Sequence, residues 1–411
     1  MPAKIKPKHA STKLPSNVIW LGITSMFNDI SSEIVLRVLP LFLSGVLGVS
    51  MSVIGMIEGV AETTSSLLKV FFGWYSDRLR SRKSLTAIGY GLSTLTRPIL
   101  LLATNWAAPF VFRFLDRVGK GIRTAPRDAL IADSVTPDNR GRAFGFNRAL
   151  DPFGATLGAL IAAAVLYGIG GFATNTGGKV TPEIFRTLII IATVPTVLSV
   201  LIIIFFVKEK KRAVAKTSVS LSFRGMGKDF YRYLAILFIF SLGMSSDAFL
   251  LLRANSVGIS AAEIFLMIAL FNLVTTLSAY PAGKLSDKLG RKTLLLIGWI
   301  FYAVLYLGFA LATSELHIWI LYISYGLYYG ITEGAEKAFV ADLVPKESRG
   351  SAYGLFNGVI GIAALPASLL AGVLWQEYGM QLPFLAGGGF AIVAALLLAI
   401  EFRRTRSIQP R

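Results

Sequence analysis

The chain alternates between long apolar stretches and short polar connections along its whole length. At a rise of ~1.5 Å per residue, each stretch is long enough to cross the ~30 Å hydrocarbon core of a bilayer as an α-helix. The pattern predicts an all-α polytopic membrane protein with twelve transmembrane helices, near residues 17–46, 51–75, 84–104, 107–131, 143–168, 184–207, 230–255, 260–282, 291–313, 316–342, 351–375 and 381–402.

Composition supports this fold class and excludes several kinds of chemistry. Of the 411 residues 54% are hydrophobic and only 16% are charged, which is typical of a membrane protein. The chain has no cysteine and two histidines. A disulfide framework, a thiolate metal site and a cysteine nucleophile are therefore excluded, and a histidine-rich metal site is disfavoured. We expect neither a metal nor a cofactor.

Lysine and arginine fall in alternate connections, which predicts the orientation of the helices. The chain end with Lys4, Lys6 and Lys8 lies on the same side as the connection with Arg78, Arg80 and Arg82, whereas "LGVSMS" on the other side has no base. The positive-inside rule then places both termini in the cytoplasm and the protein in the cytoplasmic (inner) membrane. The net charge of +18 indicates contact with anionic lipid headgroups rather than with nucleic acid.

The two halves of the chain repeat each other. "GWYSDRLRSRK" from Gly73 returns as "GKLSDKLGRK" from Gly283, and "ALIADSVTPDNRGRAFGFN" returns as "AFVADLVPKESRGSAYGLFN", both at an offset of about 210 residues. We therefore predict two pseudo-symmetric six-helix bundles, residues 1–207 and 230–411, joined by a cytoplasmic linker at 208–229. Two repeated bundles with a solute site between them are the plan of a transporter.

The repeated connection resembles the signature loop of the major facilitator superfamily. Its pattern is a glycine, three residues, an aspartate, an arginine or lysine, and then a basic pair. "RFLDRVGKGIRTAPRDALIAD" also resembles the fourth helix of that family, with Arg113 at its arginine position. The resemblance implies that helices 1, 4, 7 and 10 line a central cavity. It also implies a cytoplasmic gate formed by Gly73, Asp77, Arg78, Arg82, Gly283, Asp287, Lys288 and Arg291.

Ahead of Asp128 at its cytoplasmic end, the span at 107–131 carries six charged residues that lipid would not tolerate. Each costs ~2.5–3.5 kcal/mol at the bilayer centre. At ~100° per residue, five of them fall within an arc of roughly 80°, with Arg117 about 40° beyond it. The five residues within the arc are Arg113, Asp116, Lys120, Arg123 and Arg127. We expect the charged side chains of this span to form one hydrated stripe. Arg123 and Arg127 lie near the cytoplasmic end, where a gating role is expected.

Two roles compete for the intramembrane charges. Buried carboxylates are candidates for proton coupling, namely Asp29, Glu33, Glu58 and Glu62. The candidates for solute binding are Arg37, Arg113, Asp116, Arg117, Lys120, Arg148 and Asp151. The alternative for both sets is permanent internal ion pairing. Small residues at Gly55 and Gly59, and at Gly154 and Gly158, predict close helix contacts where the two halves rock.

These features together predict a monomeric secondary active transporter in the lipid bilayer. The expected cargo is a small anionic solute, carboxylate-bearing and metabolite- or siderophore-like, moved by proton-coupled alternating access. A proton-driven multidrug or cation exporter is the alternative, although Asp151 precedes Pro152 in place of the glycine typical of the family's drug antiporters. No Gly-x-Gly-Asp or Gly-x-Ser-Gly motif supports an intramembrane protease, so the protein is not expected to be an enzyme.

Overall fold

A computed structural model describes residues 14–76, 81–136, 139–172, 180–209, 226–345 and 348–408. All regular structure in these ranges is helical. The helices are α1 (Ser16–Gly45), α2 (Met51–Ser76), α3 (Arg82–Thr96), the 3₁₀-helix η1 (Arg97–Leu102), α4 (Ala107–Asp133), α5 (Arg140–Phe172), α6 (Pro182–Phe206), α7 (Lys228–Leu242), α8 (Asp247–Ser256), α9 (Ala261–Leu289), α10 (Arg291–Leu311), α11 (Glu315–Leu343), α12 (Arg349–Tyr378) and α13 (Leu382–Ile408).

Eight helical segments are long and apolar enough to cross a membrane, judged by length and composition. They are α3 with η1, α5, α6, α7 with α8, α9, α10, α12 and α13. The chain is thus an all-helical, multi-pass membrane protein. The full count of twelve spans stays a prediction, because the remaining helices α1, α2, α4 and α11 carry many of the intramembrane charges and fall outside these eight.

Two predicted spans differ from simple helices. The span at 84–104 changes from α-helix to the 3₁₀-helix η1 at Arg97. Pro98 lies in the first turn of η1 and has no backbone N–H, so it cannot continue the α-helical hydrogen-bond ladder.

The span predicted at 230–255 is broken into α7 and α8. Gly243 packs so closely against Gly387 that a Cβ would lie 2.7 Å from the Gly387 carbonyl oxygen. The Tyr302 hydroxyl donates a 3.1 Å hydrogen bond to the Gly243 carbonyl, and Ser246 Oγ accepts one from the Ala248 N–H to cap α8. These partners satisfy backbone groups that the break frees, which is the condition for irregular backbone at membrane depth.

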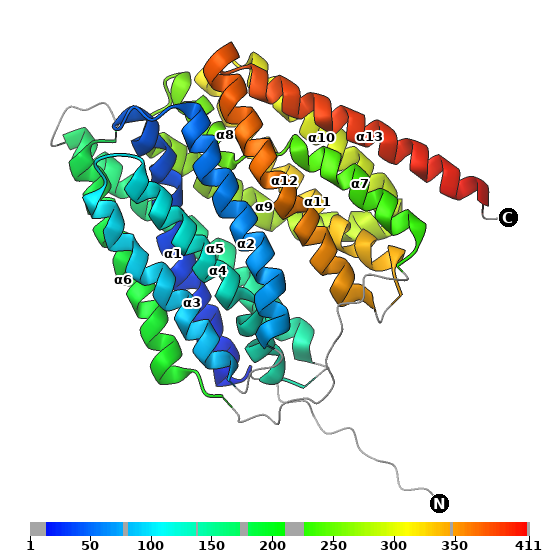
Figure 1. Ribbon diagram of the computed structural model, residues 1–411, viewed down its shortest axis with the longest axis horizontal. Coiled ribbons are helices and arrows are strands. Elements are labelled where there is room, and N and C mark those ends of the chain that lie inside the picture. Colours follow the sequence, from blue (N-terminus) through cyan, green and yellow to red (C-terminus); the bar gives the residue numbers. More distant parts are fainter. Residues whose placement is uncertain are drawn as a thin grey trace, which may run out of the picture.

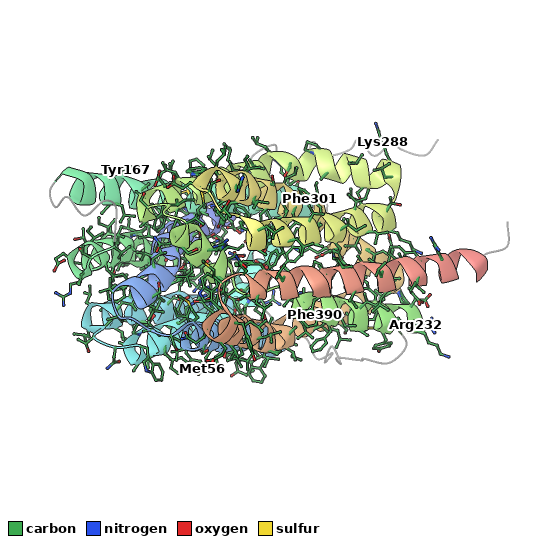
Figure 2. All side chains as sticks on the ribbon, turned by 90° about the horizontal axis from the view of Figure 1, so that it is seen from above. Met56, Tyr167, Arg232, Lys288, Phe301 and Phe390 are labelled. Atoms are coloured by element: carbon green, nitrogen blue, oxygen red, sulfur yellow. The ribbon has the colours of Figure 1, made fainter. Side chains whose placement is uncertain are left out.

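The helices form two bundles, α1 to α6 and α7 to α13 (Figure 1). Seen from above, Tyr167 of the first bundle and Arg232 of the second lie at opposite ends of the molecule (Figure 2). The contacts of α2 with α12 and of α5 with α9 join the bundles. Residues 210–225 of the predicted linker lie outside the described ranges.

Glycines allow α2 and α12 to approach each other closely. A Cβ at Gly59 would lie 2.9 Å from Leu365 Cα, and Gly55 meets the Ser368 carbonyl oxygen. The prediction of a close contact between the halves is therefore confirmed for the α2 glycines. It was wrong for Gly154 and Gly158 of α5, which face the backbone of α1 within the same bundle.

The internal repeat is also visible in two equivalent ion pairs, one in each bundle. Arg82 at the start of α3 lies 2.6 Å from Asp133 at the end of α4. Arg291 at the start of α10 forms the corresponding pair with Asp342 at the end of α11. Each pair joins two helices of one bundle, at the membrane side where the described chain begins and ends.

Candidate solute-binding cavity

A cavity of about 510 Å³ lies between the two bundles. Helices α1, α2, α4 and α5 line it from the first bundle, and α7, α8, α11 and α12 from the second. Its volume falls within the usual range for small-molecule sites. The charged residues of the lining are Asp29, Glu33, Arg37, Glu58, Glu62, Arg113, Arg117, Lys120, Asp151 and Asp247.

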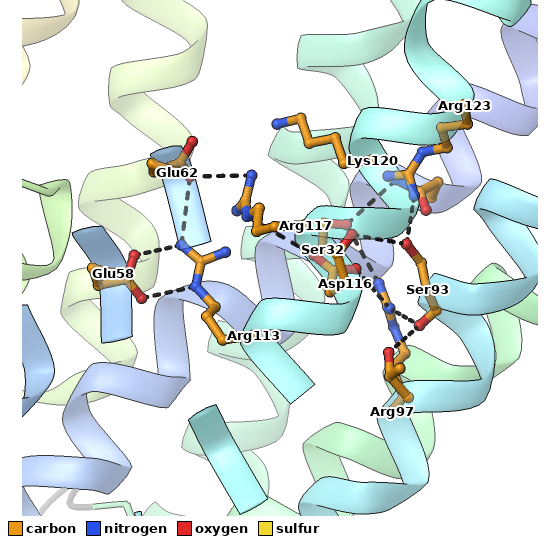
Figure 3. A network of polar contacts seen from close by, with 12 residues as sticks. Ser32, Glu58, Glu62, Ser93, Arg97, Arg113, Asp116, Arg117, Lys120 and Arg123 are labelled. Carbon is orange, nitrogen blue, oxygen red and sulfur yellow. Dashed lines mark hydrogen bonds and ion pairs between the residues drawn. The ribbon is translucent and has the colours of Figure 1, made fainter. Parts of the chain in front are cut away.

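Arg113 and Glu58 form a buried two-pronged ion pair in this lining (Figure 3). Arg113 Nε donates to Glu58 Oε1 at 2.8 Å, Nη2 donates to Oε2, and both side chains are 5% exposed. Glu58 also accepts a 3.2 Å hydrogen bond from Ser246 of the second bundle. The third nitrogen, Arg113 Nη1, is buried and has no hydrogen-bond partner among the described residues.

The next turns of α4 carry one paired and one unpaired base. Arg117 Nη1 lies 3.1 Å from Glu62 Oε1, which also lies 3.6 Å from Arg113 Nη2. Lys120 lines the cavity, but within the described part of the chain its ammonium group has no hydrogen-bond or ion-pair partner. Figure 3 shows its side chain extending beside Arg117 without a contact.

The single hydrated stripe predicted for α4 is divided between two environments. Asp116 and Arg123 face α3 and η1 instead of the cavity: Asp116 Oδ1 lies 3.6 Å from Arg97 Nη1, and Arg123 donates to Ser93 Oγ at 2.5 Å and lies 4.5 Å above the Tyr90 ring. Helical geometry explains the division, because these two residues lie roughly 40–60° to one side of Lys120. The cavity therefore receives only Arg113, Arg117 and Lys120 from α4.

Arg97 is an important charge that sequence analysis missed. Its side chain is 1% exposed, donates to Ser31 Oγ at 2.6 Å and to the Ser93 carbonyl at 2.8 Å, and pairs with Asp116. The signal was present, since an arginine within the otherwise apolar span at 84–104 requires an internal partner.

Asp29 and Asp151 also line the cavity. Asp29 has no hydrogen-bond or ion-pair partner in the described ranges. Asp151 Oδ1 accepts a 2.7 Å hydrogen bond from Ser25, which in turn accepts one of 2.6 Å from Arg127. Arg127 also pairs with Asp128 at 2.9 Å, so its charge is already compensated.

Among the described residues, two ion pairs cross between the bundles. On the cavity wall, Arg37 lies 3.2 Å from Glu33 on its own helix and 3.2 Å from Asp247 at the start of α8. Arg148 lies 3.4 Å from Glu333 beside a second crevice of about 730 Å³ between α5, α9 and α11. The Arg148 side chain is 67% exposed, so this second pair contributes little to stability.

The predicted gate is only partly described. Asp77 and Arg78 lie outside the described residues, as does the side chain of Asp287. Gly73 faces Ala125 of α4, Gly283 lines the second crevice, and Lys288 is exposed at the end of α9. Within the described ranges, no group of three or more histidine, cysteine, aspartate or glutamate side chains could hold a metal ion.

Comparison with known proteins identifies the family. The model of the Major Facilitator Superfamily matches residues 21–252 and 233–411. The chain belongs to this superfamily. A relative described as an uncharacterised MFS-type transporter of Methanocaldococcus jannaschii is 38% identical over 394 residues, covering 94% of this chain and 95% of the relative. The protein is therefore a membrane transporter of a superfamily whose members generally move solutes rather than catalyse reactions.

More distant superfamily members include an exporter and several solved transporters. The multi-drug resistance efflux pump PmrA of Streptococcus pneumoniae is 25% identical over 407 residues, covering 94% of this chain and 95% of the pump. The nucleoside transporter NupG matches with a TM-score of 0.71 at 17% identity, covering 94% of this chain and 99% of NupG. A POT family transporter matches with a TM-score of 0.76 at 13% identity, covering 95% of this chain and 98% of that transporter. Likeness at such low identity shows the shared fold alone.

Proposed function

We propose that the protein is a secondary active transporter that moves a small, carboxylate-bearing anion by proton-coupled alternating access. It would reside in the cytoplasmic membrane as a monomer with both termini in the cytoplasm. The observation that carries the proposal is that some cationic donors of the cavity are not compensated by its ion pairs. Glu58 and Glu62 compensate Arg113 and Arg117, which leaves the Lys120 ammonium group and Arg113 Nη1 as donors without an acceptor among the described residues. Cationic donors of this kind suit a carboxylate.

The same reasoning selects Asp29 among the candidate proton carriers. Glu33, Glu58 and Glu62 each accept contacts from an arginine of the cavity wall, so each already has a cationic partner. Asp29 lines the cavity and has no such contact in the described part of the chain, which leaves it as the carboxylate available to carry a proton. The remaining carboxylates would then position the arginines, while Asp29 would bind and release the coupling proton.

Replacing Lys120 with Gln is expected to weaken anion binding about 10- to 100-fold, because a hydrogen bond from a charged donor is lost. Binding of a panel of small monocarboxylates to the purified protein measures this effect. Lys337→Gln is the matched control, since Lys337 is paired with Glu333 and does not line the cavity. Equal weakening in both variants, or in neither, would remove Lys120 from the site.

Replacing Asp29 with Asn is expected to abolish accumulation driven by a pH gradient while solute exchange between equal concentrations continues. Proteoliposomes loaded at two pH values measure both activities. Asp229→Asn serves as the control, because Asp229 is 53% exposed at the start of α7. If the Asp29 variant concentrates solute as the unmodified protein does, another group carries the proton.

Proton-driven export of cations or drugs is the second candidate. The cavity lining holds six carboxylates, from Asp29, Glu33, Glu58, Glu62, Asp151 and Asp247, against four bases, from Arg37, Arg113, Arg117 and Lys120. The similarity to PmrA favours the same candidate. Uptake of anions against organic cations into vesicles with an imposed pH gradient separates the two functions.

A further inference from the structure

The break between α7 and α8 forms part of the cavity wall in the second bundle. Ser241 in the last turn of α7 and Ser245 and Ser246 in the break all line the cavity. The positive end of α8 is already occupied, since Ser246 caps it and the carboxylate of Asp247 lies in its first turn. The break is therefore poorly suited to hold the anionic part of a solute.

Two serine hydroxyls at the break lack hydrogen-bond partners. Ser241 is 2% exposed, and neither its Oγ nor that of Ser245 is bonded within the described part of the chain. The hydroxyls of Ser245 and Tyr306 lie close enough to interact, but within the described part of the chain neither completes a hydrogen bond. Unpaired buried polar groups are uncommon and costly, so a pair of them beside a cavity points to a ligand. Both oxygens lie just beneath the cavity surface, and rotation about χ1 can turn a serine hydroxyl outward.

The two walls of the cavity differ in charge. The first bundle contributes nine of the ten charged lining residues, whereas the second contributes only Asp247, which is paired with Arg37. Apart from Asp247 and the serines, the wall of the second bundle includes the uncharged side chains of Met244, Leu251 and Tyr329. A solute that satisfies both walls carries its acid group at one end and uncharged polar groups at the other.

We infer that the α7–α8 break is the subsite for the hydroxyl-bearing part of the solute, so that the cargo is a small polyhydroxylated carboxylic acid. This inference rests on the proposed function, in which Lys120 and Arg113 bind the acid group. Ser241 and Ser245 then determine specificity, because each can donate to or accept from a solute hydroxyl. An acid without hydroxyl groups would leave both serines unsatisfied.

Binding of gluconate and hexanoate to the purified full-length protein tests the inference, since the two monocarboxylates share a carbon number and differ in their hydroxyl groups. The unmodified protein is expected to prefer gluconate at least tenfold. The double variant Ser241→Ala/Ser245→Ala is expected to lose about tenfold of that preference while still binding hexanoate. Thr196→Val removes a hydroxyl that pairs with Thr94 away from the cavity, and it is expected to leave the preference unchanged.

The possible results are distinguishable. Hexanoate bound as tightly as gluconate, or a preference that survives in the double variant, overturns the inference and leaves the proposed anion transport intact. Failure of both acids and of every other anion to bind overturns the proposed function together with the inference. Removing hydroxyls that have no partner is expected to leave Tm unchanged. A clearly lower Tm in the double variant would show that the two hydroxyls support the fold, which also contradicts the inference.

Discussion

Replacing Arg113 with Gln is expected to destabilise the protein by about 3–5 kcal/mol and to abolish transport, because it leaves the Glu58 carboxylate buried without its cation. Both side chains are 5% exposed, and the guanidinium supplies two of the hydrogen bonds that Glu58 accepts. The remaining contact from Ser246 is uncharged and cannot balance the carboxylate. Thermal and denaturant unfolding of the purified variant measure the loss.

The double variant Glu58→Gln/Arg113→Gln separates stability from function. Removing both charges is expected to recover most of the stability, since a neutral pair leaves no uncompensated charge. Transport is not expected to recover, because Arg113 Nη1 would no longer be available to a solute anion. Recovery of transport in the double variant would show that Arg113 serves only to neutralise Glu58.

Replacing Gly361 with Val is expected to reduce transport about 100-fold by forcing α2 and α12 apart. A Cβ at this position would collide with Ser66 of α2, and overpacking typically costs about 1–3 kcal/mol. If the variant loses about 3 kcal/mol only in the conformation in which α2 and α12 meet, the population of that conformation falls by about 100-fold. Gly358→Val is the matched control, because it lies one turn away on α12 and its Cβ would meet nothing within 4 Å.

The absence of cysteine from the chain makes this effect directly measurable. Spin labels on cysteines introduced at Ser50 and Gln381 report the distance between the α1–α2 and α12–α13 connections, and both positions are exposed. The distance is expected to increase in the Gly361 variant and to stay unchanged in the Gly358 variant. An unchanged distance in both variants would mean that the contact between α2 and α12 tolerates a side chain at Gly361.

Much of the fold could be predicted because hydropathy and helix length report directly on the membrane. The locations of the helices and the two-bundle plan followed from apolar stretches and from the internal repeat. The break in α7–α8 could not be predicted in this way, because it depends on tertiary contacts of Gly243 with Gly387 and Tyr302. Hydropathy averages over a window and does not register a short interruption.

The sequence predicted which charged residues are shielded from lipid, but not whether each side chain points into the cavity or toward a neighbouring helix. Insertion energies correctly indicate that Asp116 and Arg123 must be shielded from lipid, yet they do not distinguish a hydrated cavity from a neighbouring helix. The partner that decides between them is Arg97, which the sequence analysis passed over. The gating roles of the named residues stay predictions, and the coupling role of Asp29 is the one that the proteoliposome experiment tests.

The matching pairs Arg82–Asp133 and Arg291–Asp342 have a consequence for the energetics of switching. Each pair joins helices of the same bundle, so in the proposed alternating-access cycle its energy is present before and after the bundles reorient. A term common to both end states cancels from the free-energy difference between them. In that cycle, weakening either pair should therefore destabilise the bundle that contains it without making the transporter favour one face of the membrane.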